Sequence, residues 1–345
     1  MERSVIRAYV VVSALCGLLP AIACHPPDAR SSSTERTAAL EAAWQDAIPA
    51  APDLLVSIRP KALRADGVYG PMLRRALELA REQRVTSGSL VLEAIEDADE
   101  VIAELGEWSP SAPADGSGAQ ELLLVLRGTR GDIDPARLVG PEGDLLWSAG
   151  PSGAVRELVH ERDHDGTPNP ASLFELPERT WVVASGAARD RARDAFAHPS
   201  HRPEPSFAPD AFATVRIDGA SLVRRVNLLR ASGPLASIGR GLRSVALDLL
   251  VPPAPVPAAT PAATPIPRRE MRALVTYSDA QAAAVAGNAI GDMLQVVGRL
   301  KPAGLAWLEP GRVDVSGSSV AVIEPVPMDL LSGFLRAGRG GTAPR

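Results

Sequence analysis

The chain has 345 residues, of which 46% are hydrophobic and 22% charged, and its formal net charge is −5 at pH 7. This balance is that of a globular protein with a buried core, long enough for one large domain or two ordinary ones. Lys61 and Lys301 are the only lysines, and no basic patch stands out, so the composition argues against a nucleic-acid partner.

The N-terminus has the pattern of a secretory signal peptide. Arg3 and Arg7 form a short basic region, and an apolar run of 16 residues follows at 8–23. A helix that spans a membrane needs about 20 residues, and Pro20 would break this one near its end. We therefore expect residues 1–23 to be a cleaved signal.

The signal ends in the sequence AIAC, which places small residues directly before Cys24. This stretch resembles the lipobox of bacterial lipoproteins, although Ala21 stands where that motif usually has leucine. The resemblance implies that the Cys24 thiol receives a diacylglycerol and that the new N-terminus is acylated. An ordinary cleaved signal is the alternative. Cys16 leaves with the signal, so the mature lipoprotein would have no disulfide and no cysteine-based zinc site.

Residues 24–38 are polar and rich in Pro and Ser, which predicts a flexible tether. About 14 extended residues reach at most about 45 Å, so the folded body can stand away from a membrane surface. His25 follows the cysteine where enteric lipoproteins of the inner membrane have Asp. We therefore expect a lipoprotein that faces the periplasm from the outer membrane, with the membrane as its partner through Cys24.

The first half of the body alternates helical and strand-like patterns. A helix is predicted from residue 37 to Pro49 and another from Pro71 to 83. Strands are predicted at 54–60, 99–105, 121–128, 154–162 and 180–186, and a helix at 187–197 ends this half.

The second half repeats this order. Strands are predicted at 212–218, 243–249, 271–278, 305–315 and 319–325, and helices at 221–230, 279–300 and 328–337. Ser278 and Gln281 predict a capping box before the long helix. The pattern predicts an α+β fold of two similar halves, each a mixed sheet with helices, and hence an internal duplication. Identity between the halves is poor, so two unrelated α+β halves remain the alternative.

Composition breaks define the expected domain limits. Four prolines crowd the stretch between the halves, and an Ala/Pro tract at 251–267 predicts a disordered or polyproline II insertion. The predicted parts are the signal 1–23, the tether 24–38, half one 39–197, a linker 198–208, half two 209–338 and a disordered tail 339–345.

The most specific chemical motif is H-E-x-x-H at His160, Glu161 and His164. On a helix, both imidazoles and the glutamate would meet one zinc ion in a metallohydrolase. The flanking residues argue against a helix, because 154–159 fit a strand and 163–170 are rich in turn residues. We therefore expect a strand end and a hairpin turn, and keep the zinc site as the alternative.

Other chemical signals are weaker. The acidic run at 92–107, which includes Glu104, fits a solvated face better than a cation site. No phosphate-binding loop, dinucleotide fingerprint or serine nucleophile elbow is present, so we predict no cofactor.

The whole chain resembles uncharacterised lipoproteins of GC-rich Gram-negative bacteria such as myxobacteria. The resemblance rests on the Cys24 signal, the preference for arginine over lysine and the repeated strand–helix order, and it implies no activity. The sequence favours a lipid-anchored, non-enzymatic binding or scaffolding protein of the cell envelope whose ligand it does not specify. The alternative is a lipid-anchored zinc metallohydrolase.

Overall fold

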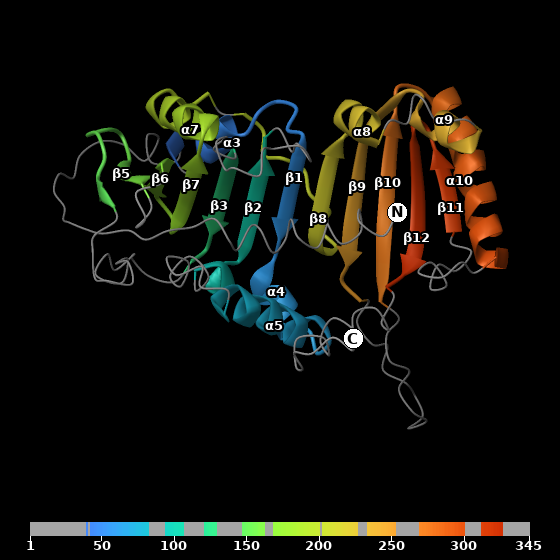
Figure 1. Ribbon diagram of the computed structural model, residues 1–345, viewed down its shortest axis with the longest axis horizontal. Coiled ribbons are helices and arrows are strands. Elements are labelled where there is room, and N and C mark those ends of the chain that lie inside the picture. The colour runs from blue at the N-terminus through green and yellow to red at the C-terminus, as the bar shows by residue number, and fades with distance from the viewer. Residues whose placement is uncertain are drawn as a thin grey trace. The chain divides into compact units, whose positions relative to one another are not determined.

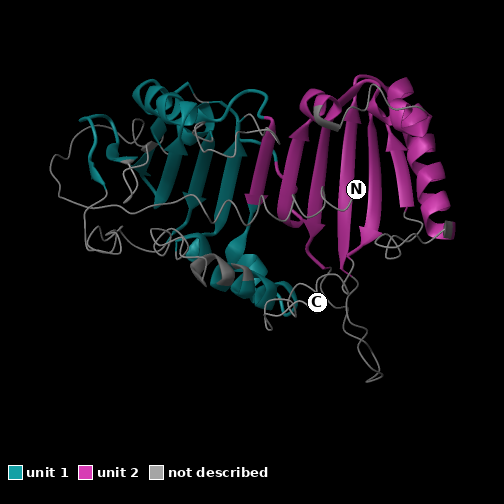
Figure 2. Ribbon diagram, in the orientation of Figure 1, with its two compact units in different colours: residues 1–52, 58–206, 335–345 teal, residues 53–57, 207–334 magenta. Residues whose placement is uncertain are grey.

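The computed structural model shows an α+β protein of helices and antiparallel strands (Figure 1). The residues that the structure describes are 39–40, 42–82, 94–106, 121–129, 147–162, 168–200, 202–226, 233–252, 269–300 and 312–326. The chain divides into two compact units (Figure 2). Unit 1 comprises residues 1–52, 58–206 and 335–345, and unit 2 comprises residues 53–57 and 207–334.

Unit 1 is built on six antiparallel strands in the order β2-β3-β7-β6-β5-β4. The strands are β2 (Glu100–Leu105), β3 (Leu122–Arg127), β4 (Ser148–Ala149), β5 (Arg156–Arg162), β6 (Pro168–Leu176) and β7 (Thr180–Ser185). The helices are α3 (Trp44–Ala47), α4 (Pro60–Ala65), α5 (Tyr69–Glu82) and α7 (Ala187–Ala197).

The central strands of unit 1 are buried on both faces. Successive residues of a strand point to opposite faces, yet the five residues from Leu122 to Leu126 are all at most 2% exposed. Helix α7 contributes the buried residues Ala188, Ala192, Ala195 and Phe196. The Phe196 ring meets Phe174 of β6 edge to face, with ring centroids 4.9 Å apart. The predicted strands at 99–105, 121–128 and 180–186 are therefore confirmed, as is the helix at 187–197.

Strand β6 was not predicted, because Pro168 and Pro170 made this stretch resemble a turn. Proline is tolerated at the start of a strand and at bulges. Pro168 is the first residue of β6, and Pro170 lies where the pairing of β5 with β6 shifts register between His160 and Arg162. The irregularity accommodates both prolines, so the prediction of a turn across 163–170 is wrong from residue 168 onward.

The proline-rich segment 198–206 contacts the body of unit 1. The backbone N–H and the hydroxyl of Ser200 both donate to the Asp46 carboxylate, each at 2.6 Å. Arg127 donates to Glu204 at 2.6 Å. The boundary between the units falls after Ser206.

Unit 2 has strands in the order β11-β12-β10-β9-β8-β1. They are β1 (Leu54–Ile58), β8 (Ala211–Asp218), β9 (Leu242–Leu250), β10 (Glu270–Tyr277), β11 (Arg312–Ser316) and β12 (Ser319–Pro325). Its helices are α8 (Gly219–Val226), α9 (Pro234–Gly239) and α10 (Ala280–Leu300). Strand β1 ends at Ile58, two residues before the predicted end, and α4 begins at Pro60. The predicted helix at 328–337 and most of the predicted strand at 305–315 lie outside the described residues.

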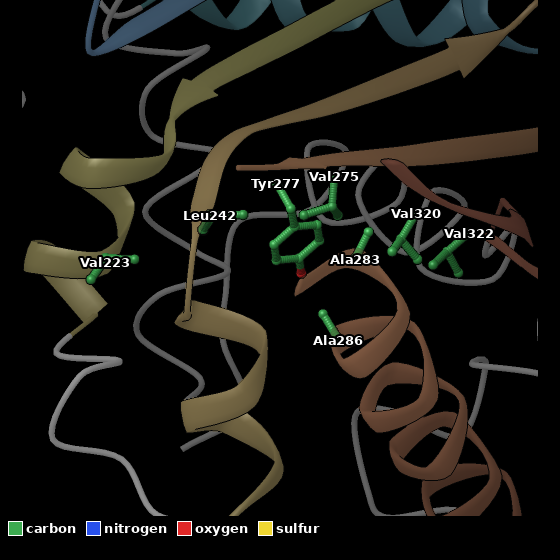
Figure 3. Packing of buried hydrophobic residues seen from close by; sticks show 8 residues of the cluster. All are labelled: Val223, Leu242, Val275, Tyr277, Ala283, Ala286, Val320 and Val322. Carbon is green, nitrogen blue, oxygen red and sulfur yellow. The ribbon is translucent and has the colours of Figure 1, made fainter. Parts of the chain in front are cut away.

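The core of unit 2 forms where α10 packs on the sheet. Tyr277 and Val275 of β10 point toward Ala283 and Ala286 of α10, with Val320 of β12 beside them (Figure 3). Both alanines are 0% exposed, and their small side chains let the helix approach the strands closely.

The N-terminus of α10 is capped differently from the prediction. Asp279 Oδ1 accepts the backbone N–H of Ala282 at 2.8 Å, and the Ser278 hydroxyl donates to the other oxygen of the same carboxylate. Asp279 is therefore the N-cap residue, and the predicted capping box of Ser278 and Gln281 is wrong.

Candidate functional site

The residues of the zinc motif lie on strand β5, not on a helix. His160 is 0% exposed and its ring stacks on Trp147, with centroids 5.1 Å apart. The side chain of Glu161, the next residue, is 60% exposed. Neighbouring residues of a strand point to opposite faces, which accounts for this contrast in burial. The strand predicted at 154–162 is confirmed from Arg156 onward. His164 lies outside the described residues.

Glu161 is engaged by helix α7. Arg189 donates from Nη2 to Glu161 Oε1 at 2.6 Å. This hydrogen bond is the main reason that the pKa of Glu161 lies below its ordinary value. Glu161 is therefore a carboxylate held by a guanidinium at the surface, an arrangement unsuited to a general base.

A buried polar centre lies between β5, β6 and α7. The Ser172 hydroxyl donates to Glu157 Oε1 at 2.5 Å and accepts from Nε of Arg189 at 2.9 Å. Arg193 donates to the same Glu157 oxygen from Nε at 2.9 Å and from Nη2 at 2.7 Å. The hydrogen bond to Glu157 raises the pKa of Arg193 above its ordinary value. We call Glu157, Ser172, Arg189 and Arg193 the α7 ionic centre.

The α7 ionic centre superficially resembles a catalytic site, because a serine hydroxyl lies against a carboxylate. A nucleophile must reach its substrate, however, and Ser172 is 0% exposed. Its hydroxyl hydrogen points to Glu157, and its oxygen already accepts a bond from Arg189. The centre therefore fastens α7 to the sheet and offers no reactive group to solvent.

A second ionic contact fastens the opposite side of α7. Arg191 donates from Nη2 to Glu104 Oε2 at 2.9 Å, and it also contacts Glu121 and the carbonyl of Ala47. The Glu104 side chain is 1% exposed. Glu104 belongs to the acidic run 92–107, so the expectation of a solvated face is wrong at this position. The strand β2 that carries it is buried, and the carboxylate is compensated by the arginine.

The other predicted sites have no counterpart in the described part of the chain. Cys24 lies outside the described residues. Within those residues, no three or more His, Cys, Asp or Glu side chains gather closely enough to hold a metal ion. None of the described helices is long and apolar enough to cross a membrane.

No family model matches the chain, and no curated protein matches it. Among solved structures, crystal form I of TP0453 is similar, with a TM-score of 0.45 and 10% sequence identity. The similarity covers 85% of this chain and 96% of that one.

Proposed function

We propose that the protein is a lipid-anchored component of a bacterial cell envelope, attached to the membrane through Cys24. The observation that carries the proposal is the signal-like N-terminus that ends in AIAC before a polar, proline- and serine-rich stretch. Basic residues, an apolar run and a small-residue site in this order are what lipoprotein signals require. The protein faces the periplasm from the outer membrane.

The proposed role of the folded body is binding or scaffolding rather than catalysis. The support comes from the polar groups of unit 1. Ser172 and Glu157, a buried hydroxyl beside a carboxylate, are both engaged with α7 arginines. Polar groups that pack a helix on its sheet suit a module that presents a surface to an envelope ligand better than an enzyme.

We also propose that the body arose by internal duplication. Within unit 1, the strands β2, β3, β7 and β6 are neighbours in this order, and within unit 2 the order is β9, β10, β12 and β11. In unit 1, β2 and β3 form an antiparallel pair, and β7 pairs with the other side of β3. In unit 2, β9 and β10 form the equivalent pair, and β12 pairs with the other side of β10. In each set the fourth strand pairs antiparallel with the third, namely β6 with β7 and β11 with β12. Helices precede both sets, namely α4 and α5 in one and α8 and α9 in the other.

Acylation of Cys24 is tested by replacing the cysteine with alanine. The wild-type chain and the Cys24→Ala variant are expressed in a Gram-negative host, and their partition into the detergent phase of a two-phase extraction is compared. We expect the wild-type chain in the detergent phase with a mass increased by the lipid, and the variant in the aqueous phase or still uncleaved. Cys16→Ala is the matched control, because it removes a cysteine of the signal and should change nothing. A wild-type chain without the added mass of the lipid, or an unchanged partition of a Cys24→Ala chain whose signal is cleaved, would refute the lipid anchor.

The zinc hydrolase remains a second candidate because the H-E-x-x-H spacing is rare. It requires His160 and His164 to share one ion, with nitrogen–zinc distances of about 2.0–2.1 Å. Elemental analysis of the purified chain tests it. Stoichiometric zinc that is lost in His160→Ala, but kept in the exposed variant His198→Ala, would replace the proposal of a binding module.

A further inference from the structure

Strand β11 is the outermost strand of unit 2. It pairs with β12, and within the described residues no other strand pairs with it. Ser316 and Ser319 flank the two-residue turn at Gly317 and Ser318, so they form a hydrogen-bonded pair. Because hydrogen-bonded and non-hydrogen-bonded pairs alternate, the backbone N–H and C=O of Val313 and Val315 point away from β12. The outer edge of β11 is thus a template for another strand.

We propose that this edge pairs with β11 of a second copy of the chain, antiparallel, about a twofold axis at Val313. In this register Val313 lies opposite Val313 of the second copy as a hydrogen-bonded pair. Arg312 lies opposite Asp314 of the second copy, and symmetry repeats this pair on the other side of the axis. The strand is therefore complementary to itself in hydrogen bonding and in charge, as a twofold interface requires.

Other antiparallel registers of the same edge are less favourable. Only shifts of two residues keep the outward groups of Val313 and Val315 hydrogen-bonded. The first such shift places Asp314 opposite Asp314 of the second copy, and like charges directly opposite one another are destabilising. The next places Asp314 opposite Ser316 and leaves Arg312 with no acid opposite. The register centred on Val313 is the one that pairs every charge of the strand.

The two charged side chains are available for this exchange. Arg312 Nε contacts Asp314 Oδ2 of the same strand at 2.7 Å, and the two side chains are 76% and 44% exposed. An ion pair this exposed contributes little to stability, so exchanging the one pair within each copy for two pairs across the axis has a small cost. Val313 points to the other face, where it packs against the core under α10.

Helix α10 supplies a second observation on the same side of unit 2. Gly287 faces β11, since a Cβ added there would lie 2.5 Å from Val315 Cγ2. At 100° per residue, the core-facing residues of α10 lie to one side of Gly287, and the residues of the flank within about 60° on the other side are alanine and glycine, with the polar residues Gln295 and Asn288 beyond them. That flank consists of Ala280, Ala284, Gly291 and Gly298.

Gly291 is not explained by contacts among the described residues. A Cβ added to it would meet no atom of those residues within 4 Å. Glycine inside a helix costs about 1 kcal/mol relative to alanine, so its presence here is unfavourable for a single copy. Edge strands pair at about 4.8 Å and helices pack at about 8–10 Å, so helices lying over two paired edge strands meet closely. A flank of small residues permits that approach between α10 and its copy.

Charge reversal tests the register. The wild-type full chain is purified in detergent, and its association is measured by analytical ultracentrifugation over a range of concentrations. We expect a monomer–dimer equilibrium, and a dissociation constant raised about 10- to 100-fold in Arg312→Asp or Asp314→Arg, since each change turns two attractive pairs into two repulsive ones. The double variant Arg312→Asp with Asp314→Arg restores opposite charges across the axis and should recover the wild-type constant. Unchanged thermal unfolding of the single variants shows that they fold.

Disulfide trapping tests the position of the axis. In a background of Cys16→Ala and Cys24→Ala, Val313→Cys places two thiols opposite one another at a Cα separation of about 5.5 Å, within disulfide range. Val285→Cys is the control, because Val285 is 50% exposed and lies on the far side of α10 from the flank. We expect rapid crosslinking at position 313 and none above background at 285. A monomer at all concentrations, equal crosslinking of both variants, or failure of the double charge reversal to recover the wild-type constant would each overturn the proposal.

Discussion

Replacing Arg193 by methionine should destabilise unit 1 by several kcal/mol. Arg193 makes two hydrogen bonds to one oxygen of Glu157, at 2.9 and 2.7 Å, and the Glu157 side chain is 6% exposed. Removing one partner of a buried ion pair costs about 3–5 kcal/mol, because the other charge stays buried. Arg193 itself is 33% exposed, which favours the lower end, about 3 kcal/mol. With a urea dependence of about 2 kcal/mol per molar, the unfolding midpoint should fall by about 1.5 M.

The measurement is urea unfolding of the full chain followed by tryptophan fluorescence, since Trp44, Trp147 and Trp181 are buried in unit 1. Asp190→Ala is the matched control. Asp190 also contacts Arg193, but at 3.5 Å and with an 83% exposed side chain, so its loss should cost at most about 0.5 kcal/mol. Adding Glu157→Gln to Arg193→Met removes the buried charge and keeps an acceptor for Ser172, so it should recover part of the loss. Equal effects of Arg193→Met and Asp190→Ala, or no recovery in the double variant, would show that the centre does not fasten α7.

Three further predictions concern single positions. Tyr277→Phe should raise the free energy of unfolding by about 1 kcal/mol, because the buried hydroxyl has no hydrogen-bond partner in the described residues. Chemical unfolding at pH 7 tests this. Burial raises the pKa of Tyr277 to about 12, so the fold disfavours the phenolate, whereas the unfolded chain ionises near pH 10. Wild-type stability should therefore fall as the pH rises from 10 to 12, and the Phe variant should lack that loss in a pH titration of unfolding. Asp279→Ala should lower the melting temperature by less than Arg193→Met does. The hydrogen bond from the backbone of Ala282 lowers the pKa of Asp279. The stability that the cap contributes is therefore present above the ordinary pKa of an aspartate and is lost as the pH falls below it. Calorimetry at acid pH can follow this loss. Gly128→Ala should destabilise unit 1 by about 1–3 kcal/mol, because φ is +70° and the new Cβ would collide with Asp99, and a melting temperature equal to wild type would contradict this.

The elements that the sequence predicted well are those whose signal is local. The apolar run 122–126 predicts β3 because burial on both faces leaves no polar position. The long helix predicted at 279–300 matches α10 at Ala280–Leu300. By contrast, the sequence pattern does not predict β6, because its two prolines are typical of a turn. They are compatible with a strand here only because the pairing with β5 shifts register beside them. No local pattern contains that information.

The α7 ionic centre could not be predicted, since its members are brought together by strand pairing. Glu157 and Ser172 are 15 residues apart and meet only because β5 pairs with β6. The one local signal is the run of three arginines at every second position, 189, 191 and 193, in a helix with a buried face. The prediction that Glu104 is solvated is wrong for the same reason. Its burial depends on β3 and α7 rather than on the acidic residues beside it in the sequence.

The position of β1 has a consequence for synthesis of the chain. Residues 53–57 belong to unit 2, whereas the rest of that unit begins at Phe207. β1 therefore leaves the ribosome before nearly all of unit 1 and at least 7 s before β8, its neighbour in the sheet, since translation proceeds at about 5–20 residues per second. During that interval the segment LLVSI, with its first four residues buried in the finished fold, lacks the strand of its own unit beside which it lies. A chain that folds only after its synthesis is complete avoids this delay. A fragment that starts at Phe207 would lack β1 and expose the edge of β8 to aggregation.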